Sequence, residues 1–435
     1  MDLLKKQIFE KVKEFYLHKK KNNFIPGISD VPVSGKFIDH IEASYITEAA
    51  LDGWLTTGRF NDQFQKDLAN FINIKSLITA NSGSSANFIA FSSLCSDKMG
   101  DSVIKKNDEV ISVAAGFPTT VNPILTNGCI PVFVDIKLGT YNIDENLIEN
   151  AISKKTKAIV LAHTLGNPFN LDVIKKICNK YKLLLMEDCC DALGSTYNGK
   201  HVGTFGDVAT LSFYPAHHIT MGEGGAVFTN SIKIKRVSES IRDWGRDCYC
   251  EPGKDNTCGK RFNWQLGDLP YGFDHKYTYS NLGYNFKITD MQAACGLAQL
   301  AKLNFFIKKR KENFKFLKKN LSDLCDFLIL PEHENKSDPS WFGFLLTLRN
   351  ENILREDLLK FLNEKKIGTR LLFSGNLTKQ PYMKNYEYKI SGKLENTDKI
   401  MKQSFWIGLH PSLNDDMLEY SVEQIRYFFK NYKKK

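Results

Sequence analysis

Long apolar runs are missing from this sequence of 435 residues, and no stretch of 18 consecutive apolar residues occurs. A helix that spans a bilayer needs about 20 such residues, so we expect no membrane span. The first segment, residues 1–16, instead spaces its apolar residues as a helix does and interrupts them with Lys and Glu. That pattern predicts an amphipathic helix and not a signal peptide, and it favours a cytoplasmic protein.

Signatures of several other protein classes are also missing. The formal net charge is +10, yet no basic stripe with interleaved aromatic residues occurs, so we expect no nucleic-acid binding. The surplus of Lys and Arg fits a solvated surface that favours an anionic substrate or an acidic protein partner. The ten Cys residues are expected to stay reduced in the cytoplasm, which excludes a disulfide framework.

The first two-thirds of the chain alternate short, apolar, β-branched runs with helical patterns such as Asp172–Tyr181. This alternation predicts an α/β fold with a mostly parallel mixed sheet. The expected strands are Glu109–Val113, Ile130–Asp135, Ala158–His163, Leu183–Glu187, Val208–Phe213 and Ala226–Thr229.

A long helical pattern from Thr289 to Asn320 predicts a single helix that connects two domains. We assign residues 1–300 to a large cofactor-binding domain, which includes the N-terminal helical segment. Residues 301–435 form a smaller C-terminal α/β domain, with a strand and a helix expected at Trp341–Leu348 and Arg355–Glu364. The Gly-, Asp- and Cys-bearing segment 245–275 belongs to the large domain and predicts a functional loop, because structureless loops of that length are uncommon.

Two short motifs follow apolar runs in the large domain. Residues 81–87, NSGSSAN, open a helical segment, where backbone N–H groups and serine hydroxyls can bind a phosphate. Residues 186–191, MEDCCD, end another strand in an acidic pair. A carboxylate at the ligand edge of a parallel sheet can keep a pyridinium nitrogen protonated. Each motif alone is also compatible with an ordinary turn, a helix cap or a surface acid.

A third stretch, residues 212–226 (SFYPAHHITMGEGGA), points to a family that the sequence resembles. The DegT/DnrJ/EryC1 sugar aminotransferases of fold type I have a similar stretch, with Ser-Phe, three residues, Lys and a Gly-rich turn, and they present the three motifs in this order. Residues 281–294 also resemble their segment that crosses the dimer interface. The resemblance covers roughly residues 30–430. It implies the fold-type I aminotransferase fold, a pyridoxal or pyridoxamine phosphate cofactor and a homodimer.

The resemblance also implies roles for individual residues. Asp188 would pair with the pyridine nitrogen, and Phe117 would stack on the cofactor ring. Asn285 would reach the cofactor phosphate of the neighbouring subunit. The residues implied in binding the phosphate within the chain are Ser84, Ser85 and Ser212.

The lysine of this family is absent, because His217 stands at its position and no Lys occurs between Lys200 and Lys233. An imidazole cannot form the Schiff base that a lysine amine forms, so we expect pyridoxamine phosphate held without a covalent bond. A histidine can still act as a general base near neutral pH. We predict that His217 removes a proton from the cofactor's aminomethyl carbon once a keto-sugar is attached, and that the adjacent 3-hydroxyl then leaves. His218 is the competing base, or a packed, hydrogen-bonded neighbour.

Four cysteines form a second group of candidate ligands. Cys248 and Cys250 precede Cys258 by a short loop, and Cys190 follows the strand that ends at Asp188. The ligand count suits an iron–sulfur cluster and suits structural zinc equally. Unligated thiols are the third interpretation.

The combination of His217 with Cys190, 57 intervening residues and a Cys-x-Cys-x₇-Cys motif resembles the CDP-4-keto-6-deoxyglucose 3-dehydratases. This resemblance implies a [2Fe–2S] cluster on Cys190, Cys248, Cys250 and Cys258, and CDP-4-keto-6-deoxy-D-glucose as the substrate. No flavin or nicotinamide fingerprint is visible, so a separate NAD(P)H-dependent iron–sulfur flavoprotein reductase would supply the electrons. The product would be a precursor of the 3,6-dideoxyhexoses of lipopolysaccharide O-antigens.

Two other functions compete with this one. The cluster-free GDP-4-keto-6-deoxymannose 3-dehydratases also resemble the chain and also have His for Lys, but the four cysteines argue against them. The retained Asp188 and phosphate-binding residues argue against a non-catalytic ligand-binding relative. The arginines that are candidates for diphosphate contacts, or for ordinary surface pairing, are Arg59, Arg242 and Arg246. The sequence assigns no role to His163 and Asp191.

Overall fold

The central sheet of the computed structural model has eight strands in the order β1-β9-β8-β5-β4-β2-β3-β14. The structure describes residues 1–19, 23–250 and 252–432. Strands β8, β5, β4, β2, β3 and β14 run parallel to one another, and β9 pairs antiparallel with both β8 and β1. The strands are β1 Ser76–Ala80, β2 Glu109–Val113, β3 Ile130–Val134, β4 Thr156–Ala162, β5 Leu184–Asp188, β8 Val208–Ser212, β9 Gly225–Thr229 and β14 Lys389–Ile390. The six predicted strands are confirmed, with ends that differ by at most two residues.

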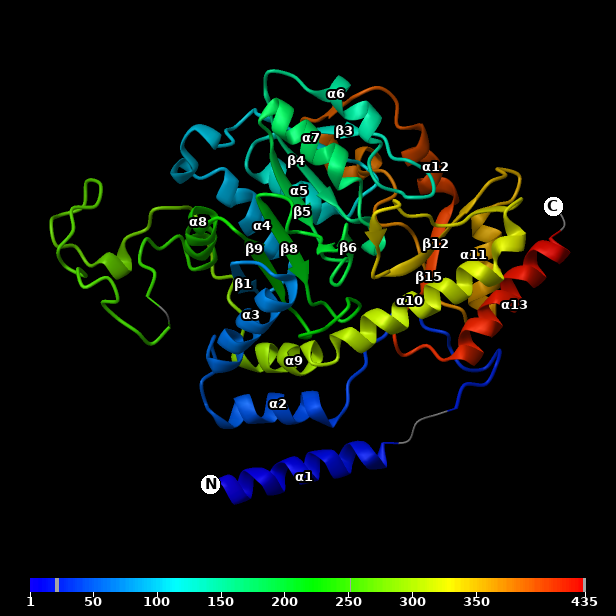
Figure 1. Cartoon of the computed structure of the whole chain (residues 1–435), viewed down its shortest axis with the longest axis horizontal. Coiled ribbons are helices and arrows are strands. Elements are labelled where there is room, and N and C mark those ends of the chain that lie inside the picture. The colour runs from blue at the N-terminus through cyan, green and yellow to red at the C-terminus, as the bar shows by residue number, and fades with distance from the viewer. Residues whose placement is uncertain (20–22, 251, 433–435) are drawn as a thin grey trace.

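Helices cover both faces of this sheet, which explains why its strands read as continuous apolar runs. Neighbouring residues on a strand point to opposite faces, so Val110 joins the core cluster under one layer of helices and Ile111 the cluster under the other. The first layer contains α4 Gly83–Leu94, α5 Pro118–Thr126 and α8 Ile232–Arg242. The second contains α3 Arg59–Ile72, α7 Leu171–Tyr181, α9 Asp290–Leu300 and α10 Leu303–Asn320. Figure 1 shows the two layers around the sheet.

The predicted single helix from Thr289 to Asn320 is wrong in one respect, because it is two helices, α9 and α10, that are interrupted at Ala301 and Lys302. The backbone N–H of Lys302 donates to the Gln299 carbonyl at 2.9 Å, a tighter turn than a helix makes. The Lys302 ammonium also binds the buried Glu42 carboxylate at 2.6 Å. The bend therefore lies where the chain is held against α2 His40–Leu51.

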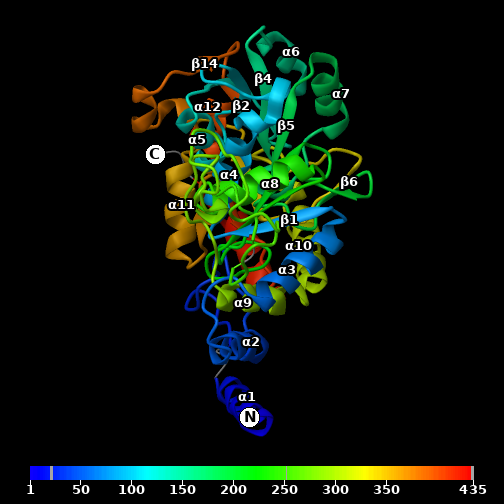
Figure 2. The same ribbon diagram turned by 90° about the vertical axis from the view of Figure 1, so that its left-hand side faces the viewer.

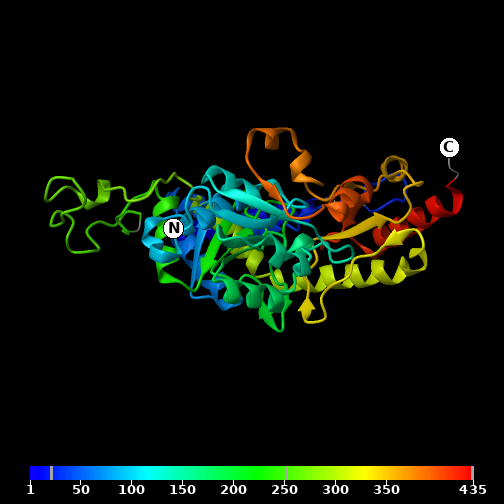
Figure 3. The same cartoon turned by 90° about the horizontal axis from the view of Figure 1, so that it is seen from above.

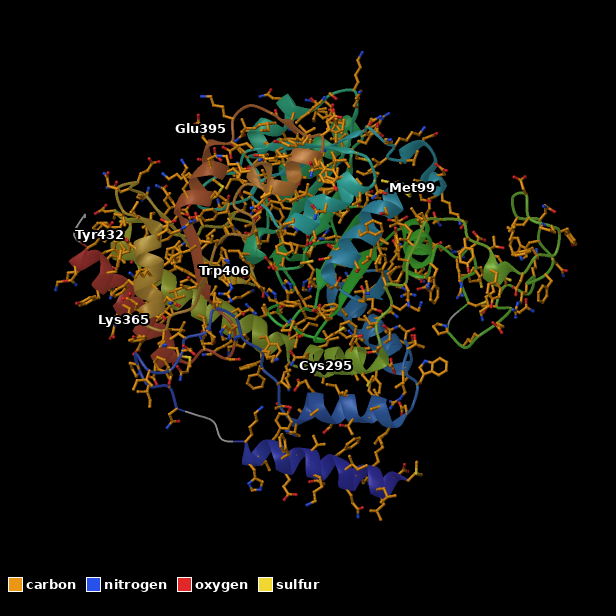
Figure 4. The ribbon with its side chains drawn as sticks, turned by 180° about the vertical axis from the view of Figure 1, so that it is seen from behind. Met99, Cys295, Lys365, Glu395, Trp406 and Tyr432 are labelled. Atoms are coloured by element: carbon orange, nitrogen blue, oxygen red, sulfur yellow. The ribbon has the colours of Figure 1, made fainter. Side chains whose placement is uncertain are left out.

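A second, antiparallel sheet has the strand order β10-β12-β15-β13, with its own core cluster. Its strands are β10 Leu328–Ile329, β12 Gly343–Leu348, β13 Thr369–Arg370 and β15 Ser404–Gly408. Helices α11 Arg355–Glu364, α12 Glu395–Gln403 and α13 Asp415–Asn431 accompany them. Figure 4 shows Trp406 of β15 on the side of the molecule that carries this sheet. A third sheet, β11-β6-β7, joins Ser337–Asp338 to Thr196–Tyr197 and Lys200–His201. The division of the chain at residue 300 is kept as a proposal.

The predicted N-terminal helix is α1, Asp2–His18, which has no buried residue. It packs against α2, and Lys5 forms an ion pair with Glu48 at 2.6 Å. Figure 2 shows α1 farthest from the central sheet, beyond α2. In the described part of the chain, no helix has both the length and the apolar character needed to cross a bilayer.

The segment between α8 and α9 leaves the body of the molecule as a long loop, at the opposite end from α13 (Figures 1 and 3). Its base is closed by isolated β-bridges that join Asp243 to Asn285 and Arg246 to Tyr279. The described part of the loop contains a single turn of 3₁₀ helix, His275–Tyr277. This segment, which we name the cysteine loop (residues 247–279), overlaps most of the predicted functional loop, residues 245–275, and carries Cys248, Cys250 and Cys258.

Candidate active site and metal centre

A cavity of about 500 Å³ lies at the carboxyl ends of strands β4, β5 and β8. Parallel α/β sheets bind ligands at this edge, because the loops that leave the strands diverge there. Asp188 and Ser212 end β5 and β8, and His163 follows β4, so all three line the cavity. The cavity also contains Ser84, Phe117, Cys190 and His217. The structure therefore brings most of the predicted site residues together.

The Asp188 carboxylate is nearly buried and is fixed by three hydrogen bonds. Its Oδ2 accepts from the Asn87 amide at 2.8 Å and from the Thr120 hydroxyl at 2.7 Å. Its Oδ1 accepts from the backbone N–H of Cys190 at 3.0 Å. Thr210 in turn donates to the Asn87 carbonyl oxygen at 2.6 Å, which orients that amide. The donors on both oxygens therefore hold the Asp188 carboxyl group in one orientation at the wall of the cavity.

The N-terminus of α4 forms another part of the cavity wall. Ser82 caps this helix by accepting the backbone N–H of Ser85 at 3.0 Å, and its hydroxyl donates to the Ser85 hydroxyl. Ser82, Gly83 and Ser84 line the cavity with Ser212, whereas Ser85 is not among the lining residues. A Cβ atom on Gly83 would lie 2.5 Å from the Ser212 Cβ, so only glycine fits. A helix N-terminus with hydroxyl groups around it attracts phosphate.

His217 reaches the cavity from the turn that follows β8, and its side chain is 15% exposed. Its Nδ1 lies 3.3 Å from the Asp191 carboxylate, at ion-pair distance but without hydrogen-bond geometry. The Phe342 ring covers the imidazole at a centroid distance of 5.2 Å. A proton on Nδ1 is favoured by the facing carboxylate, which leaves Nε2 as the proton acceptor.

The two other histidines near the site, His218 and His163, already have hydrogen-bond partners. His218 is 3% exposed, does not line the cavity and bonds the Ser340 carbonyl at 2.8 Å through Nε2. Burial, with the charge of Arg310 nearby, lowers the pKa of His218 well below its ordinary value, so it stays neutral. His163 stacks on Phe169 at 4.2 Å and bonds the buried Glu187 carboxylate at 3.0 Å. Of these three imidazoles, His217 alone has a nitrogen available in the cavity for proton transfer.

Phe117 lines the cavity from the start of α5 and is half exposed, with an edge contact to Phe373 at 6.0 Å. Asn285 is exposed at the base of the cysteine loop and does not line the cavity of its own chain. Two of the three candidate arginines already have partners. Arg59 pairs with Asp52 and Glu48, and Arg242 pairs with Asp243 at 2.9 Å.

Sequence reasoning missed one wall of the cavity, which comes from the C-terminal third of the chain. Phe342, Arg370 and Trp406 line it, and the Trp406 indole N–H donates to the Leu371 carbonyl at 3.1 Å. Arg370 is exposed and brings a positive charge to this wall. These residues are isolated in the sequence and belong to no motif, so no local signal identified them.

Three cysteines of the cysteine loop meet in a second, separate pocket. Cys248, Cys250 and Cys258 line it together with His275 and Arg261. A backbone N–H donates to each sulfur at 3.4 Å, from Cys250 to Cys248, from Thr257 to Cys250 and from Lys260 to Cys258. Such contacts stabilise thiolates, which are the metal-binding form of cysteine.

The charges around these sulfurs differ. Burial and the neighbouring Cys250 thiol raise the pKa of Cys248. Burial opposes ionisation of the other two thiols, but the Thr257 contacts lower the pKa of Cys250 and the His275 contact lowers the pKa of Cys258. Two of the three thiols are therefore held nearer the thiolate form than a free cysteine.

The structure does not bring Cys190 to this pocket. Its sulfur lies in the first cavity, where a Cβ atom on Gly83 would meet it at 3.2 Å. Burial, followed by the charge of Asp188, raises the pKa of the Cys190 thiol well above its ordinary value. In this chain Cys190 is thus a neighbour of the phosphate-type cradle on α4.

Comparison with known proteins identifies the family. The profile of the "DegT/DnrJ/EryC1/StrS aminotransferase family" matches residues 36–426. The chain is 61% identical over 407 residues to the "Lipopolysaccharide biosynthesis protein RfbH" of Salmonella typhimurium, covering 93% of each chain. It is 47% identical over 425 residues to the "dTDP-4-dehydro-2,6-dideoxy-D-glucose 3-dehydratase" of Saccharopolyspora spinosa, covering 98% of this chain and 92% of that one.

A solved structure shares the fold over nearly the whole chain. It is the "GDP-4-keto-6-deoxymannose-3-dehydratase with a trapped PLP-glutamate geminal diamine", with a TM-score of 0.81 and 29% identity. The match covers 91% of this chain and 100% of that one. The expected fold-type I architecture is thereby confirmed, and the chain belongs to the DegT/DnrJ/EryC1/StrS aminotransferase family.

Proposed function

We propose that this chain is a vitamin-B6-dependent 3-dehydratase of a nucleotide-linked 4-keto-6-deoxy sugar. The observation that carries the proposal is which side chain stands at the position of the family's Schiff-base lysine. His217 stands there in the cavity, and none of the described residues that line the cavity is a lysine. A site with an imidazole base and no amine favours proton removal and loss of a hydroxyl over transfer of an amino group.

The cavity fits pyridoxamine phosphate by its chemistry. Asp188 offers a fixed carboxylate for a pyridinium nitrogen, and the α4 N-terminus with Ser84 and Ser212 offers a phosphate cradle that a Cβ on Gly83 would fill. When bound, this cofactor supplies an electron sink for the sugar carbons. Phe117 is positioned to stack on the aromatic ring of the cofactor. Asp188 would hold the ring nitrogen, and Ser84 at the start of α4 and Ser212 at the end of β8 would hold the phosphate.

His217 is proposed to accept and return the proton at Nε2. The Asp191 carboxylate, 3.3 Å from Nδ1, stabilises the imidazolium that results. Phe342 restricts rotation of the ring and keeps water from one of its faces. The base is thereby aimed into the cavity before substrate arrives, which lowers the cost of reaching the reactive geometry.

We further propose a [2Fe–2S] cluster in the cysteine loop. The pocket contains three thiols, each with a backbone N–H directed at its sulfur, which fits an iron–sulfur donor set. The cluster would deliver two electrons singly to the dehydrated sugar. The electrons come from an NAD(P)H-dependent iron–sulfur flavoprotein reductase, and the extension of the loop away from the body leaves it accessible to such a partner (Figure 3).

The proposal includes a homodimer in the cytoplasm. Asn285 is exposed and turned away from the cavity of its own chain, as a residue that serves the neighbouring subunit would be. Large aromatic side chains are exposed nearby, which marks a contact surface. They are Trp244, Tyr249, Phe262, Tyr271, Tyr277, Tyr279 and Tyr284.

CDP-4-keto-6-deoxy-D-glucose is the proposed substrate, which leads to a 3,6-dideoxy sugar for O-antigen synthesis. The names of the relatives support a nucleotide-linked sugar and lipopolysaccharide synthesis as its setting. The cysteine motif supports CDP. Arg370 at the cavity wall is suited to the diphosphate, because guanidinium pairs well with phosphate oxygens.

The test is exchange of the C3 oxygen with H₂¹⁸O, followed by mass spectrometry of fragment ions that locate the label at C3, because the 4-keto oxygen exchanges with water without an enzyme. The purified protein is loaded with pyridoxamine phosphate and offered the CDP-, GDP- and dTDP-linked 4-keto-6-deoxy sugars in parallel. We expect label at C3 of the CDP-linked sugar without any reductase, since dehydration is reversible. Formation of an amino sugar with glutamate, without label exchange, would instead establish an aminotransferase.

A further inference from the structure

The largest side chain among the fully buried residues that the structure describes is a cation, Arg310 of α10. It is 1% exposed. Burial lowers the pKa of its guanidinium to about 10, and the charge of Asp191 opposes this shift. The guanidinium therefore stays protonated at neutral pH, in surroundings where a charge is unfavourable. The reaction proposed above does not use it.

Arg310 contacts the segment that leads into β12. Its Nη1 donates to the carbonyl oxygens of Trp341 and Phe342 at 3.2 and 3.1 Å. Both acceptors are neutral, and the Nε–H of Arg310 has no hydrogen-bond partner among the described residues. Two neutral acceptors compensate a buried charge only in part, so the stability of the fold does not explain a cation at this position.

The charge of Arg310 instead interacts with both side chains that flank the proposed base. The central carbon of the guanidinium lies 5.7 Å from the centroid of the Phe342 ring, and cations are attracted to aromatic faces. The same ring lies 5.2 Å from the imidazole of His217, at an interplanar angle of 35°. Asp191, whose carboxylate lies 3.3 Å from Nδ1 of His217, also attracts the guanidinium.

The backbone around Phe342 is held from other directions as well. Nε2 of His218 donates to the Ser340 carbonyl at 2.8 Å. The Phe342 N–H donates to the Leu165 carbonyl at 2.8 Å. Arg310 supplies the donor for the two carbonyls that follow Ser340, so it completes the hydrogen bonding that fixes this segment.

We infer that Arg310 is a positioning residue for His217. It holds Phe342 against the imidazole through two hydrogen bonds to carbonyl oxygens and through the contact of its guanidinium with the ring. Arg310 does not line the cavity, so it acts through Phe342 and not on the sugar or the cofactor. The inference rests on the role of His217 as the base in the proposed function.

NMR of the holoenzyme measures this positioning without turnover. The full-length protein, loaded with pyridoxamine phosphate, is labelled with ¹³C at Cε1 of histidine, and His217→Asn identifies the signal of His217. An aromatic ring 5.2 Å away shifts that signal, and Phe342→Leu gives its position without the ring. We expect Arg310→Met to move the His217 signal most of the way to its position in Phe342→Leu.

The same variants are then compared in the C3 oxygen exchange. Arg310→Met should lower kcat by about a hundredfold, because a displacement of about 1 Å at a reacting group can reduce the rate that much. KM for the sugar nucleotide should stay within about twofold, since Arg310 does not contact the cavity. Arg310→Lys should recover part of the signal shift and of the rate, because an ammonium keeps the charge and still donates to a carbonyl.

Asn313 provides a matched control on the same helix. It is 2% exposed, and its amide donates to the carbonyls of Leu409 and His410 at 3.2 and 3.4 Å. Asn313→Leu therefore also removes two buried contacts between α10 and a neighbouring segment, but that segment does not line the cavity. The His217 signal and kcat should stay at their wild-type values, even where the free energy of unfolding falls.

Each outcome bears on Arg310. A His217 signal that stays at its wild-type position in Arg310→Met, or in Arg310→Lys if Arg310→Met does not fold, overturns the inference. A signal that moves as far in Asn313→Leu as in Arg310→Met also overturns it, because the cause would then be a general loosening of α10. If the wild type exchanges no C3 oxygen, the proposed function fails, and the NMR comparison still decides whether Arg310 positions the imidazole.

Discussion

The cavity of the body and the pocket of the cysteine loop are built in opposite ways. The cavity collects Asp188, Ser212 and His217 from strand ends that the central sheet fixes relative to one another. The pocket collects its cysteines and His275 from one segment, residues 247–275, whose described part has almost no regular structure. A ligand in the cavity enters a site that the core has already formed, whereas a metal in the loop would also stabilise the fold of the loop itself.

The largest expected effect concerns His217, the proposed general base in the cavity. His217→Asn should slow C3 oxygen exchange by about a thousandfold, because a positioned general base typically contributes 10²–10⁴ in rate. The cofactor should still bind, since Asp188 and the α4 cradle are unchanged, and its absorption spectrum checks this. His333→Asn, at an exposed histidine that does not line the cavity, serves as the control. Wild-type exchange in His217→Asn would remove the residue from the reaction.

The second expected effect tests whether the cysteine loop and the cavity act in separate steps of the reaction. Cys250→Ser should reduce formation of the 3-deoxy product by at least about tenfold, since a weaker ligand impairs the cluster. Exchange of the C3 oxygen should stay within about twofold of wild type, because the base and the cradle lie in the body. Both are followed by mass spectrometry of the sugar nucleotide. Equal loss of the two activities would mean that the regions are not independent.

The third effect concerns the body alone and depends on pH. His410 is 1% exposed and bonds the Pro32 carbonyl at 2.9 Å, and burial lowers its pKa to about 4. Because the unfolded chain binds this proton near pH 6.5 and the folded protein does not, stability falls as the pH drops from about 6.5 to about 4. The loss from this group at pH 5 is about 2 kcal/mol. Urea unfolding of wild type and His410→Gln at pH 7 and pH 5 should show a smaller pH dependence in the variant.

The smallest expected effect concerns Lys98, which binds the cysteine loop at its base. Lys98 binds Asp247 at 2.8 Å and Ser280 at 2.9 Å, and its side chain is half exposed. Lys98→Ala should change the free energy of unfolding by less than about 1 kcal/mol, since exposed ion pairs contribute little. Amide hydrogen exchange should nevertheless rise in residues 247–280 and stay unchanged in the central sheet. Faster exchange throughout the protein would show that the loop and the body unfold together.

Sequence reasoning predicted the body better than the loop for a physical reason. A buried parallel strand needs an apolar run and a polar residue where it ends, so β5 and Asp188 could be recognised together. The interruption between α9 and α10 could not, because Ala301 and Lys302 are good helix formers and the bend depends on Glu42 of another helix. His275 was also missed, since its environment comes from Asp247 and Trp264 and no spacing rule connects them.

The wall formed by Phe342, Arg370 and Trp406 is among the last parts of the cavity to be synthesised. Asp188 and His217 leave the ribosome long before this wall is synthesised, and domains tend to fold from the N-terminus as they emerge. A nascent chain that stops before residue 340 would hold His217 in a trough open to water. The cavity therefore gains the side chains that cover this side only when translation is almost complete, so an incomplete chain holds a less enclosed site.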